Sequence, residues 1–251
     1  MTPLISFVIT THNRPKLLVR AIKSVIAQGP EAELIVVADE GSRETRDAVA
    51  GALRETDSFL SYPGTRGPSN SRNFGRNIAR GGWICFLDDD DTITPDYLEQ
   101  AKPHLIPGTV IYGNYTRVQD DPDLSFGAPK PRLLKKRTLD TIEVQNFIPI
   151  GAFLVPIDLA RRVDFDTYLA SREDWDYLLK LYAFAPFQHV DICGFRYHHA
   201  PGPNRNNLVS GERRADLLSI YRRHKATSFR VKRKRAELLA RYGIKQSPRS
   251  L

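Results

Sequence analysis

Residues 83–91 read WICFLDDDD, an apolar run that ends in four consecutive aspartates. A short apolar run between polar residues is typical of a strand buried inside a sheet. Two earlier stretches repeat this arrangement, since ISFVI at 5–9 leads into TTHN, and LIVV at 34–37 leads into ADEGS. We therefore expect three polar clusters at the same edge of one sheet.

Helical segments separate these strands along the chain. Helices are expected over 17–26, 45–53 and 69–80, and residues 59–62 give one more apolar strand. Alternating strands and helices are typical of a parallel sheet that is covered on both faces. The prediction is an α/β fold with a mixed, mostly parallel, Rossmann-like sheet flanked by helices. In such sheets ligands bind beyond the carboxyl ends of the strands, where the polar clusters fall.

The second half of the chain has weaker patterns. After the aspartates, Thr94 is predicted to be a helix N-cap, with Pro95 at the first helical position. We expect extended segments at 110–115, 150–155 and 187–197, a helix around 175–182, loops at 117–137 and 200–210, and two basic helices within 212–242.

Composition limits the class of protein. The chain has 251 residues, of which 41% are hydrophobic and 26% are charged, as in an ordinary globular protein with its own core. No apolar stretch approaches the roughly 20 residues of a membrane span, and the amino terminus has no features of a signal peptide. The two cysteines, Cys85 and Cys193, lie in apolar runs without the spacing of a metal site. A reducing, cytoplasmic location is therefore expected.

Positive charge is concentrated near the carboxyl end. Residues 211–251 hold thirteen Lys or Arg and three Asp or Glu, a net charge of +10, whereas the whole chain has +8. A basic extension of this kind suits an anionic membrane surface or a polyanion, which would place the protein peripherally at the inner face of the membrane. Aromatic residues are sparse there, so binding to nucleic-acid bases is not indicated.

The four aspartates suggest a metal site. Two unit charges about 4 Å apart repel by roughly 4 kcal/mol at an effective dielectric constant near 20, so adjacent carboxylates favour a bound cation. Mg²⁺ or Mn²⁺, bound by oxygen atoms and shared with phosphates, suits such ligands. A solvated acidic turn, in which Asp91 favours the N-terminus of the next helix, is the alternative.

Five motifs occur in an order that resembles family 2 glycosyltransferases of the GT-A fold. They are VITTHNR, VVADEGS, SNSRNFG, FLDDDDTITP and SREDWDYLLKL, and VDFD precedes the last of them. The resemblance covers about residues 4–200. It implies a GT-A domain over 1–210, followed by a basic helical extension over 211–251.

The resemblance also implies roles for single residues on the donor side. Thr10, His12 and Asp39 match positions that contact the base and ribose of a nucleotide, and Arg72 matches an arginine that helps to hold it. Asp88 and Asp90 match the Asp-x-Asp pair, with Asp90 as the direct ligand of Mn²⁺ or Mg²⁺. The same resemblance places Asp89 near the ribose or the donor sugar. Glu40 departs from the usual Asp-Asp-Gly-Ser pattern, so the preferred base stays open.

On the acceptor side, the resemblance implies that Asp174 is the general base, with Glu173 as the alternative. A sugar hydroxyl is a poor nucleophile until its proton is removed, which is why such a base is needed. The alternative is structural, because Ser171 to Asp174 also matches a capping box, in which a charged Asp174 would be a weaker base. The resemblance further implies that His199 binds the metal or the diphosphate, although a histidine pair at a strand end is often only a surface feature.

The implied reaction transfers a sugar from a nucleotide-diphosphate sugar, uridine diphosphate by default, to a hydroxyl of a glycan, lipid-linked or other acceptor, with inversion. A nucleotidyltransferase is a second interpretation, but Thr10 to Asn13 lack the glycines of a phosphate loop. A third is a non-catalytic nucleotide- or polyanion-binding protein that works through its basic extension.

Overall fold

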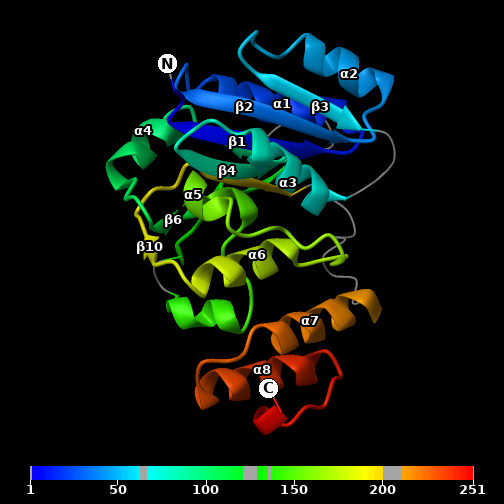
Figure 1. The fold of residues 1–251 in the computed structure, drawn as a ribbon, viewed down its shortest axis with the longest axis vertical. Coiled ribbons are helices and arrows are strands. Elements are labelled where there is room, and N and C mark those ends of the chain that lie inside the picture. The colour runs from blue at the N-terminus through cyan, green and yellow to red at the C-terminus, as the bar shows by residue number, and fades with distance from the viewer. Residues whose placement is uncertain (1, 63–66, 121–128, 135–136, 200–210, 251) are drawn as a thin grey trace.

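The computed structural model describes residues 2–62, 67–120, 129–134, 137–199 and 211–250. Its centre is a seven-stranded sheet in the order β10-β6-β9-β4-β1-β2-β3 (Figure 1). The strands along the chain are β1 (Ile5–Thr11), β2 (Ala32–Asp39), β3 (Ser58–Tyr62), β4 (Trp83–Asp88), β6 (Val110–Tyr112), β9 (Phe153–Pro156) and β10 (Phe187–His189). The first four strands are parallel to one another and β9 is antiparallel to its neighbours, which confirms a mixed, mostly parallel sheet.

Helices cover both faces of this sheet. The α-helices are α1 (Pro15–Ile26), α2 (Arg43–Ala50), α3 (Pro68–Ile78), α4 (Tyr97–Ala101), α5 (Ile157–Ala160), α6 (Glu173–Tyr182), α7 (Gly211–Arg223) and α8 (Phe229–Arg241). Right-handed crossovers place α1 and α2 on one face and α3 on the other, because the strand order reverses after β3. β1 and β2 are buried along their whole length, as their apolar runs predict.

Close packing between α3 and β1 depends on a glycine. A Cβ atom built on Gly75 would lie 2.3 Å from Cγ1 of Val8, closer than any real contact allows. The helix therefore approaches the strand more closely than an alanine at this position would permit. This contact brings α3, which carries Arg72, directly over the carboxyl half of β1.

A second, smaller sheet closes one side of the site. Its order is β5 (Thr92–Ile93), β11 (Phe195–His199), β7 (Tyr115–Gln119) and β8 (Lys130–Arg132). β5 follows the four aspartates directly, and it pairs antiparallel with β11. The acidic turn is therefore held between the large sheet and the small one.

Several local predictions for the second half are wrong. α4 begins at Tyr97, with Asp96 as its N-cap, because the backbone N–H of Thr94 donates to the carbonyl of Gly194 and continues the small sheet. The strand expected over 110–115 is broken at Gly113, so that Tyr115 joins the other sheet. Residues Ile150–Ala152 form a 3₁₀ turn before β9.

The basic helices α7 and α8 pack beneath α6 (Figure 1). Leu217, Ile220, Tyr221 and Leu239 are buried and belong to the same hydrophobic core as the sheet. The loop predicted over 200–210, and with it the expected domain boundary at 210, lies outside the described residues. In the described ranges there is no helix of the length and apolarity that a membrane crossing requires.

Candidate active site

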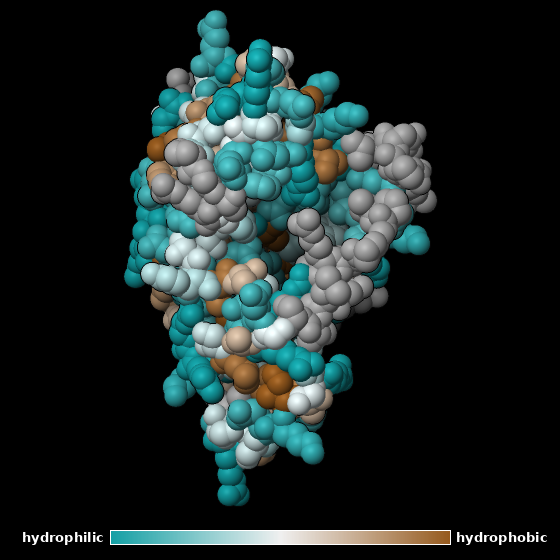
Figure 2. Space-filling view, turned by 90° about the vertical axis from the view of Figure 1, so that its right-hand side faces the viewer, coloured by the Kyte–Doolittle hydropathy of each residue, from teal (hydrophilic) through white to brown (hydrophobic). Residues whose placement is uncertain are grey.

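The polar clusters that follow β1, β2 and β4 meet at one pocket. Register explains this, because Thr10 on β1 pairs with Asp88 on β4 and with Val37 on β2. The pocket has a volume of about 410 Å³ and is lined by Thr10, Thr11, His12, Arg14, Asp39, Pro68, Ser71, Arg72, Asp88 and Glu173. In Figure 1 the carboxyl end of β3 points to the right-hand side of the molecule. That side faces the viewer in Figure 2, which shows a hollow at mid-height.

The loops after β1 and β2 are tied to each other. Nδ1 of His12 lies 2.8 Å from the carbonyl oxygen of Asp39, and the amide of Ser42 donates to Oδ1 of Asn13 at 2.7 Å. The carboxylate of Asp39 also accepts the backbone N–H of Gly67 at 2.9 Å, which attaches the start of α3 to the same wall. The three residues predicted to contact the nucleotide, Thr10, His12 and Asp39, thus share one side of the pocket.

Arg72 connects the end of β4 to the start of α6 across the pocket. It is buried, and its two terminal nitrogens donate to Asp88 and to Glu173, each at 2.8 Å. Burial alone would lower the pKa of this guanidinium, but the two carboxylates raise it above its ordinary value, so the cation is retained. One buried positive charge therefore joins the end of β4 to the start of α6.

The four aspartates have four different environments. Asp89 is fully buried, accepts the hydroxyl of Thr11 at 2.6 Å and forms an ion pair with Arg14. Arg14 also donates to Asp90 at 2.7 Å. Burial raises the pKa of Asp89 to about 6, against the opposing effect of Arg14. Asp89 is not among the residues that line the pocket, and its predicted contact with the ribose or the donor sugar stays a prediction.

Asp88, Asp90 and Asp91 form a cluster with the chemistry of a cation site. One carboxylate oxygen from each lies within 4.8 Å of the others. Such oxygens suit Mg²⁺ or Mn²⁺, and the partial exposure of Asp88 and Asp90 leaves room for further ligands. Asp91 is buried, its carboxylate accepts the backbone N–H of His198 at 2.8 Å, and burial raises its pKa well above the ordinary value. The residues present therefore fit a divalent cation, with Asp91 as a candidate that the motif comparison missed.

The two histidines of the pair differ in burial, since His198 is buried and His199 is partly exposed. His198 is buried between Thr92 and Asp120, at 2.8 and 2.7 Å, and burial lowers its pKa. Asp120 in turn pairs with Arg20, which donates to the carbonyl of Asp90 at 2.6 Å. Among the residues described, His199 does not join the carboxylate cluster, so its role as a metal ligand stays a prediction.

Glu173 and Asp174 begin α6, and Glu173 lines the pocket on the far side of Arg72 from Asp88. Asp174 accepts Nδ2 of Asn146 at 2.8 Å, and its other oxygen accepts the backbone N–H of Trp175 at 2.7 Å. Burial, followed by the charge of Glu173, raises the pKa of Asp174 to about 7. A carboxylate with this pKa is a suitable proton acceptor near neutral pH.

The capping box predicted over Ser171 to Asp174 is wrong. Arg172 is the N-cap, in the left-handed region with φ of 64°, and makes no side-chain capping bond. The hydroxyl of Ser171 instead donates to Asp216 on α7. Burial raises the pKa of Asp174, so the start of the helix does not make this carboxylate a weaker base.

A protein-family model matches the part of the chain that contains the strand ends of this site. The model of Glycosyl transferase family 2 matches residues 6–155, which include β1, β2, β4 and the acidic turn. The chain belongs to this family. The matched residues do not include Glu173 and Asp174, which begin α6.

Parts of this chain are similar in sequence to curated proteins. The succinoglycan biosynthesis protein ExoO of Rhizobium meliloti is 36% identical over 99 residues, which cover 39% of this chain and 28% of that protein. A GalNAc(5)-diNAcBac-PP-undecaprenol beta-1,3-glucosyltransferase of Campylobacter jejuni is 36% identical over 117 residues, or 45% of this chain and 38% of that protein. The chain thus spans well under half the length of either relative.

Among solved structures, TarS 1–349 of S. aureus in complex with UDP-GlcNAc superimposes with a TM-score of 0.69 at 20% identity. The superposition covers 95% of this chain and 72% of that chain. Such coverage supports the GT-A type of fold beyond the part matched by the family model.

Proposed function

We propose that this glycosyltransferase moves a sugar from a nucleoside-diphosphate sugar to an acceptor hydroxyl in a single, inverting displacement. The observation that carries the proposal is the pocket in which the acidic end of β4 faces Glu173 across Arg72, with Asp174 next to it on α6. The residues proposed to bind the nucleotide would thus lie across Arg72 from the helix that carries the proposed base. TarS, which shares the fold, has been solved with UDP-GlcNAc and with UDP, which supports uridine diphosphate as the first nucleotide to test.

On the donor wall, Thr10, His12 and Asp39 would contact the base and ribose, and Arg72 would hold the nucleotide. Asp88 and Asp90, together with Asp91, would bind Mn²⁺ or Mg²⁺, with His199 as a further candidate ligand. When bound, the cation would offset the negative charge that grows on the departing diphosphate. Arg72, buried and charged, contributes to the same offset from the protein side.

On the acceptor wall, Asp174 would take the proton of the attacking hydroxyl. As that oxygen forms its bond to the anomeric carbon, the bond to the diphosphate breaks and the electron pair leaves with the nucleotide. Attack from the face opposite the leaving group inverts the anomeric configuration. Asn146 would orient Asp174 by donating a hydrogen bond to one of its oxygens. Because Asp174 only accepts in this bond, its carboxylate could still take up a proton.

The acceptor is proposed to be a glycan, a lipid-linked saccharide or another hydroxyl compound. The name of the Campylobacter relative includes an undecaprenol-linked substrate, which supports the lipid-linked class. The +10 charge of residues 211–251 would favour an anionic membrane surface, and so a cytoplasmic enzyme that is peripheral at the inner face of the membrane.

A nucleotide-sugar panel with Mn²⁺ tests this proposal. We expect one donor, a uridine-diphosphate sugar first, to raise the melting temperature and to be hydrolysed slowly. Asp174→Asn should keep donor binding but lose turnover, whereas Asp140→Asn, in a 3₁₀ turn whose residues do not line the pocket, should keep both. If no donor binds, or if Asp174→Asn retains turnover, the proposed site is wrong.

A further inference from the structure

The turn that precedes Glu173 and Asp174 is held by the C-terminal helices. Asp216 on α7 is buried, and its Oδ2 accepts the backbone N–H of Ser171 at 2.8 Å and the Ser171 hydroxyl at 2.9 Å. The next residue, Arg172, has a left-handed backbone, which costs an L-residue about 1–2 kcal/mol. Because the strained residue lies directly between Ser171 and Glu173, the Asp216 bonds fix the direction in which α6 starts.

The partner of Asp174 is held by the same helices. Asn146 follows a segment in which the carbonyl of Val144 accepts the hydroxyl of Tyr221 at 2.6 Å. Glu143, one residue earlier, accepts the backbone N–H and the hydroxyl of Thr227 at 2.9 and 2.7 Å. The fully buried Arg235 donates to the carbonyl of Glu143 at 2.8 Å. Both sides of the Asp174–Asn146 hydrogen bond are thus attached to the segment that contains α7 and α8.

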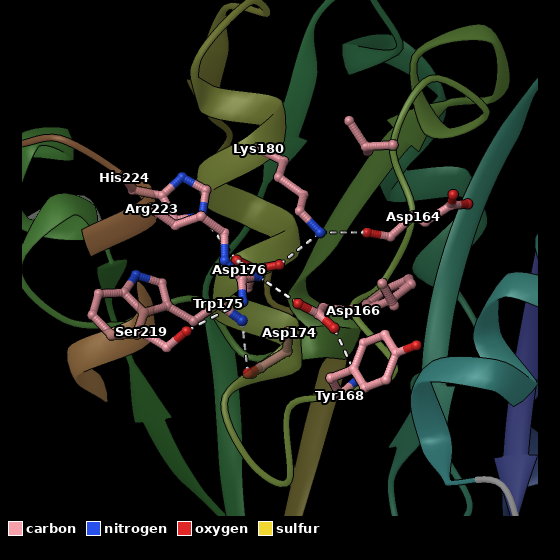
Figure 3. A network of polar contacts seen from close by, with 12 residues as sticks. Asp164, Asp166, Tyr168, Asp174, Trp175, Asp176, Lys180, Ser219, Arg223 and His224 are labelled. Carbon is pink, nitrogen blue, oxygen red and sulfur yellow. Dashed lines mark hydrogen bonds and ion pairs between the residues drawn. The ribbon is translucent and has the colours of Figure 1, made fainter. Parts of the chain in front are cut away.

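A third attachment lies at Asp176, two residues after Asp174 (Figure 3). Asp176 is fully buried and accepts the imidazole of His224 at 2.8 Å and the guanidinium of Arg223 at 3.2 Å. Lys180 on α6 completes its surroundings at 2.7 Å. A buried carboxylate that pairs with Arg223 and Lys180 and is hydrogen-bonded to a histidine is costly to disrupt, so this contact fixes α6 against the end of α7.

We propose that α7 and α8 position the candidate general base, and that Asp216 is a positioning residue for Glu173 and Asp174. This inference rests on the proposed function of Asp174. The sequence of α7 and α8 indicates only a basic segment. We assign a second role to its buried face, which sets the geometry of the acceptor wall. If a change in the helix displaces a reacting group by about 1 Å, the reaction rate can fall by up to about a hundredfold.

Asp216→Ala, made in the full chain, tests the proposal. We expect donor binding, measured by calorimetry, to change less than about twofold, since Asp216 itself contacts Ser171 and Arg72 keeps its hydrogen bond to Asp88. The kcat for donor turnover should fall about ten- to a hundredfold with little change in KM, because the base is misplaced. Asp216→Asn retains one acceptor oxygen and should recover part of the loss.

Asp57→Ala is the matched control. Asp57 also has a fully buried side chain, and it accepts the backbone N–H and the guanidinium of Arg54 in a turn far along the chain from α6. It should lower stability without the selective loss of kcat. An equal fall in kcat for both variants, or a fall in donor binding with Asp216→Ala, would overturn the positioning role.

Hydrogen exchange separates this inference from the proposed function. In Asp216→Ala the amides of residues 171–176 should exchange faster, while those of β1 and β4 should not. If the wild-type chain turns over no nucleotide sugar, the proposed function fails but this exchange result still decides whether Asp216 holds the turn. Should Asp216→Ala not fold, Ser171→Ala removes one of the two bonds, and unchanged exchange there would contradict the proposal.

Discussion

Replacing Glu173 by glutamine distinguishes the two candidate bases. Oε1 of Glu173 accepts a hydrogen bond from Arg72 at 2.8 Å, and the amide oxygen of glutamine can accept the same bond. The substitution therefore removes one negative charge and leaves the size and main contact of the side chain unchanged. If Asp174 is the base, the only large effect is on its titration.

The size of that effect is set by the repulsion between two adjacent carboxylates. At an effective dielectric constant near 20, two unit charges about 4 Å apart repel by about 4 kcal/mol, and more distant charges repel less. Solvent screening of partly exposed groups reduces this to about 1 kcal/mol, somewhat less than one pKa unit. The charge of Glu173 is the second cause, after burial, of the raised pKa of Asp174. Removing it, and leaving Arg72 without its second carboxylate, lowers that pKa.

The assay is the rate of donor turnover at saturating donor across the acidic and neutral range. A carboxyl group with a lower pKa is ionised to a greater extent in acid, so the acidic limb of the profile should move down by about one pH unit. At one unit below the wild-type pKa of about 7, the variant should be up to about fivefold faster than the wild type. Loss of turnover at every pH would identify Glu173 as the base, and an unmoved limb would exclude Asp174 as the titrating group.

Three further predictions concern stability and the cation. Asp174→Asn should raise the free energy of unfolding at pH 8 by about 1 kcal/mol, measured in urea, and the gain should vanish near pH 4. The sign follows because the folded pKa is raised to about 7, so the charged carboxyl destabilises the fold increasingly as pH rises from the unfolded value to the folded one. Asp90→Ala should abolish the Mn²⁺-dependent part of UDP binding in calorimetry; unchanged binding would contradict the cation site. Gly75→Ala should destabilise the fold by about 1–3 kcal/mol in a thermal melt, because the new methyl group meets Val8, whereas Gly51→Ala, with no atom closer than 3.8 Å, should have little effect.

The fold was predictable because its decisive signals are local. The apolar runs of β1, β2 and β4 are continuous in sequence, and a parallel sheet brings their ends together without further information. The GT-A type of architecture and the meeting of Thr10, Asp39 and Asp88 at one pocket are accordingly confirmed.

The details of the site were not predictable, because they depend on partners far apart in the chain. Four identical aspartates give no sign of which is buried, and Asp89 is distinguished only by Thr11 and Arg14, more than seventy positions earlier. Ser171 has the sequence of a capping residue, but Asp216, 45 positions later, takes its hydrogen bonds. Thr94 also has the sequence of a capping residue, but its backbone N–H donates to the carbonyl of Gly194 and extends the small sheet. In each case a local preference worth about 1 kcal/mol was outweighed by tertiary contacts.

Backbone strain shows how these distant contacts serve the site. In the described residues, the non-glycine positions with a left-handed backbone are Asn13, Glu40 and Arg172, and each belongs to one of the motifs around the pocket. Such conformations persist only where the surrounding structure enforces them. Asn13 is held through its bond to Ser42, and the Arg172 turn is held by the bonds of Ser171 to α7. The same contacts that impose the strain also set the directions of His12, Asp39 and Glu173. Contacts outside the pocket, including those of the C-terminal helices, therefore hold the strained turns that orient the side chains of this site.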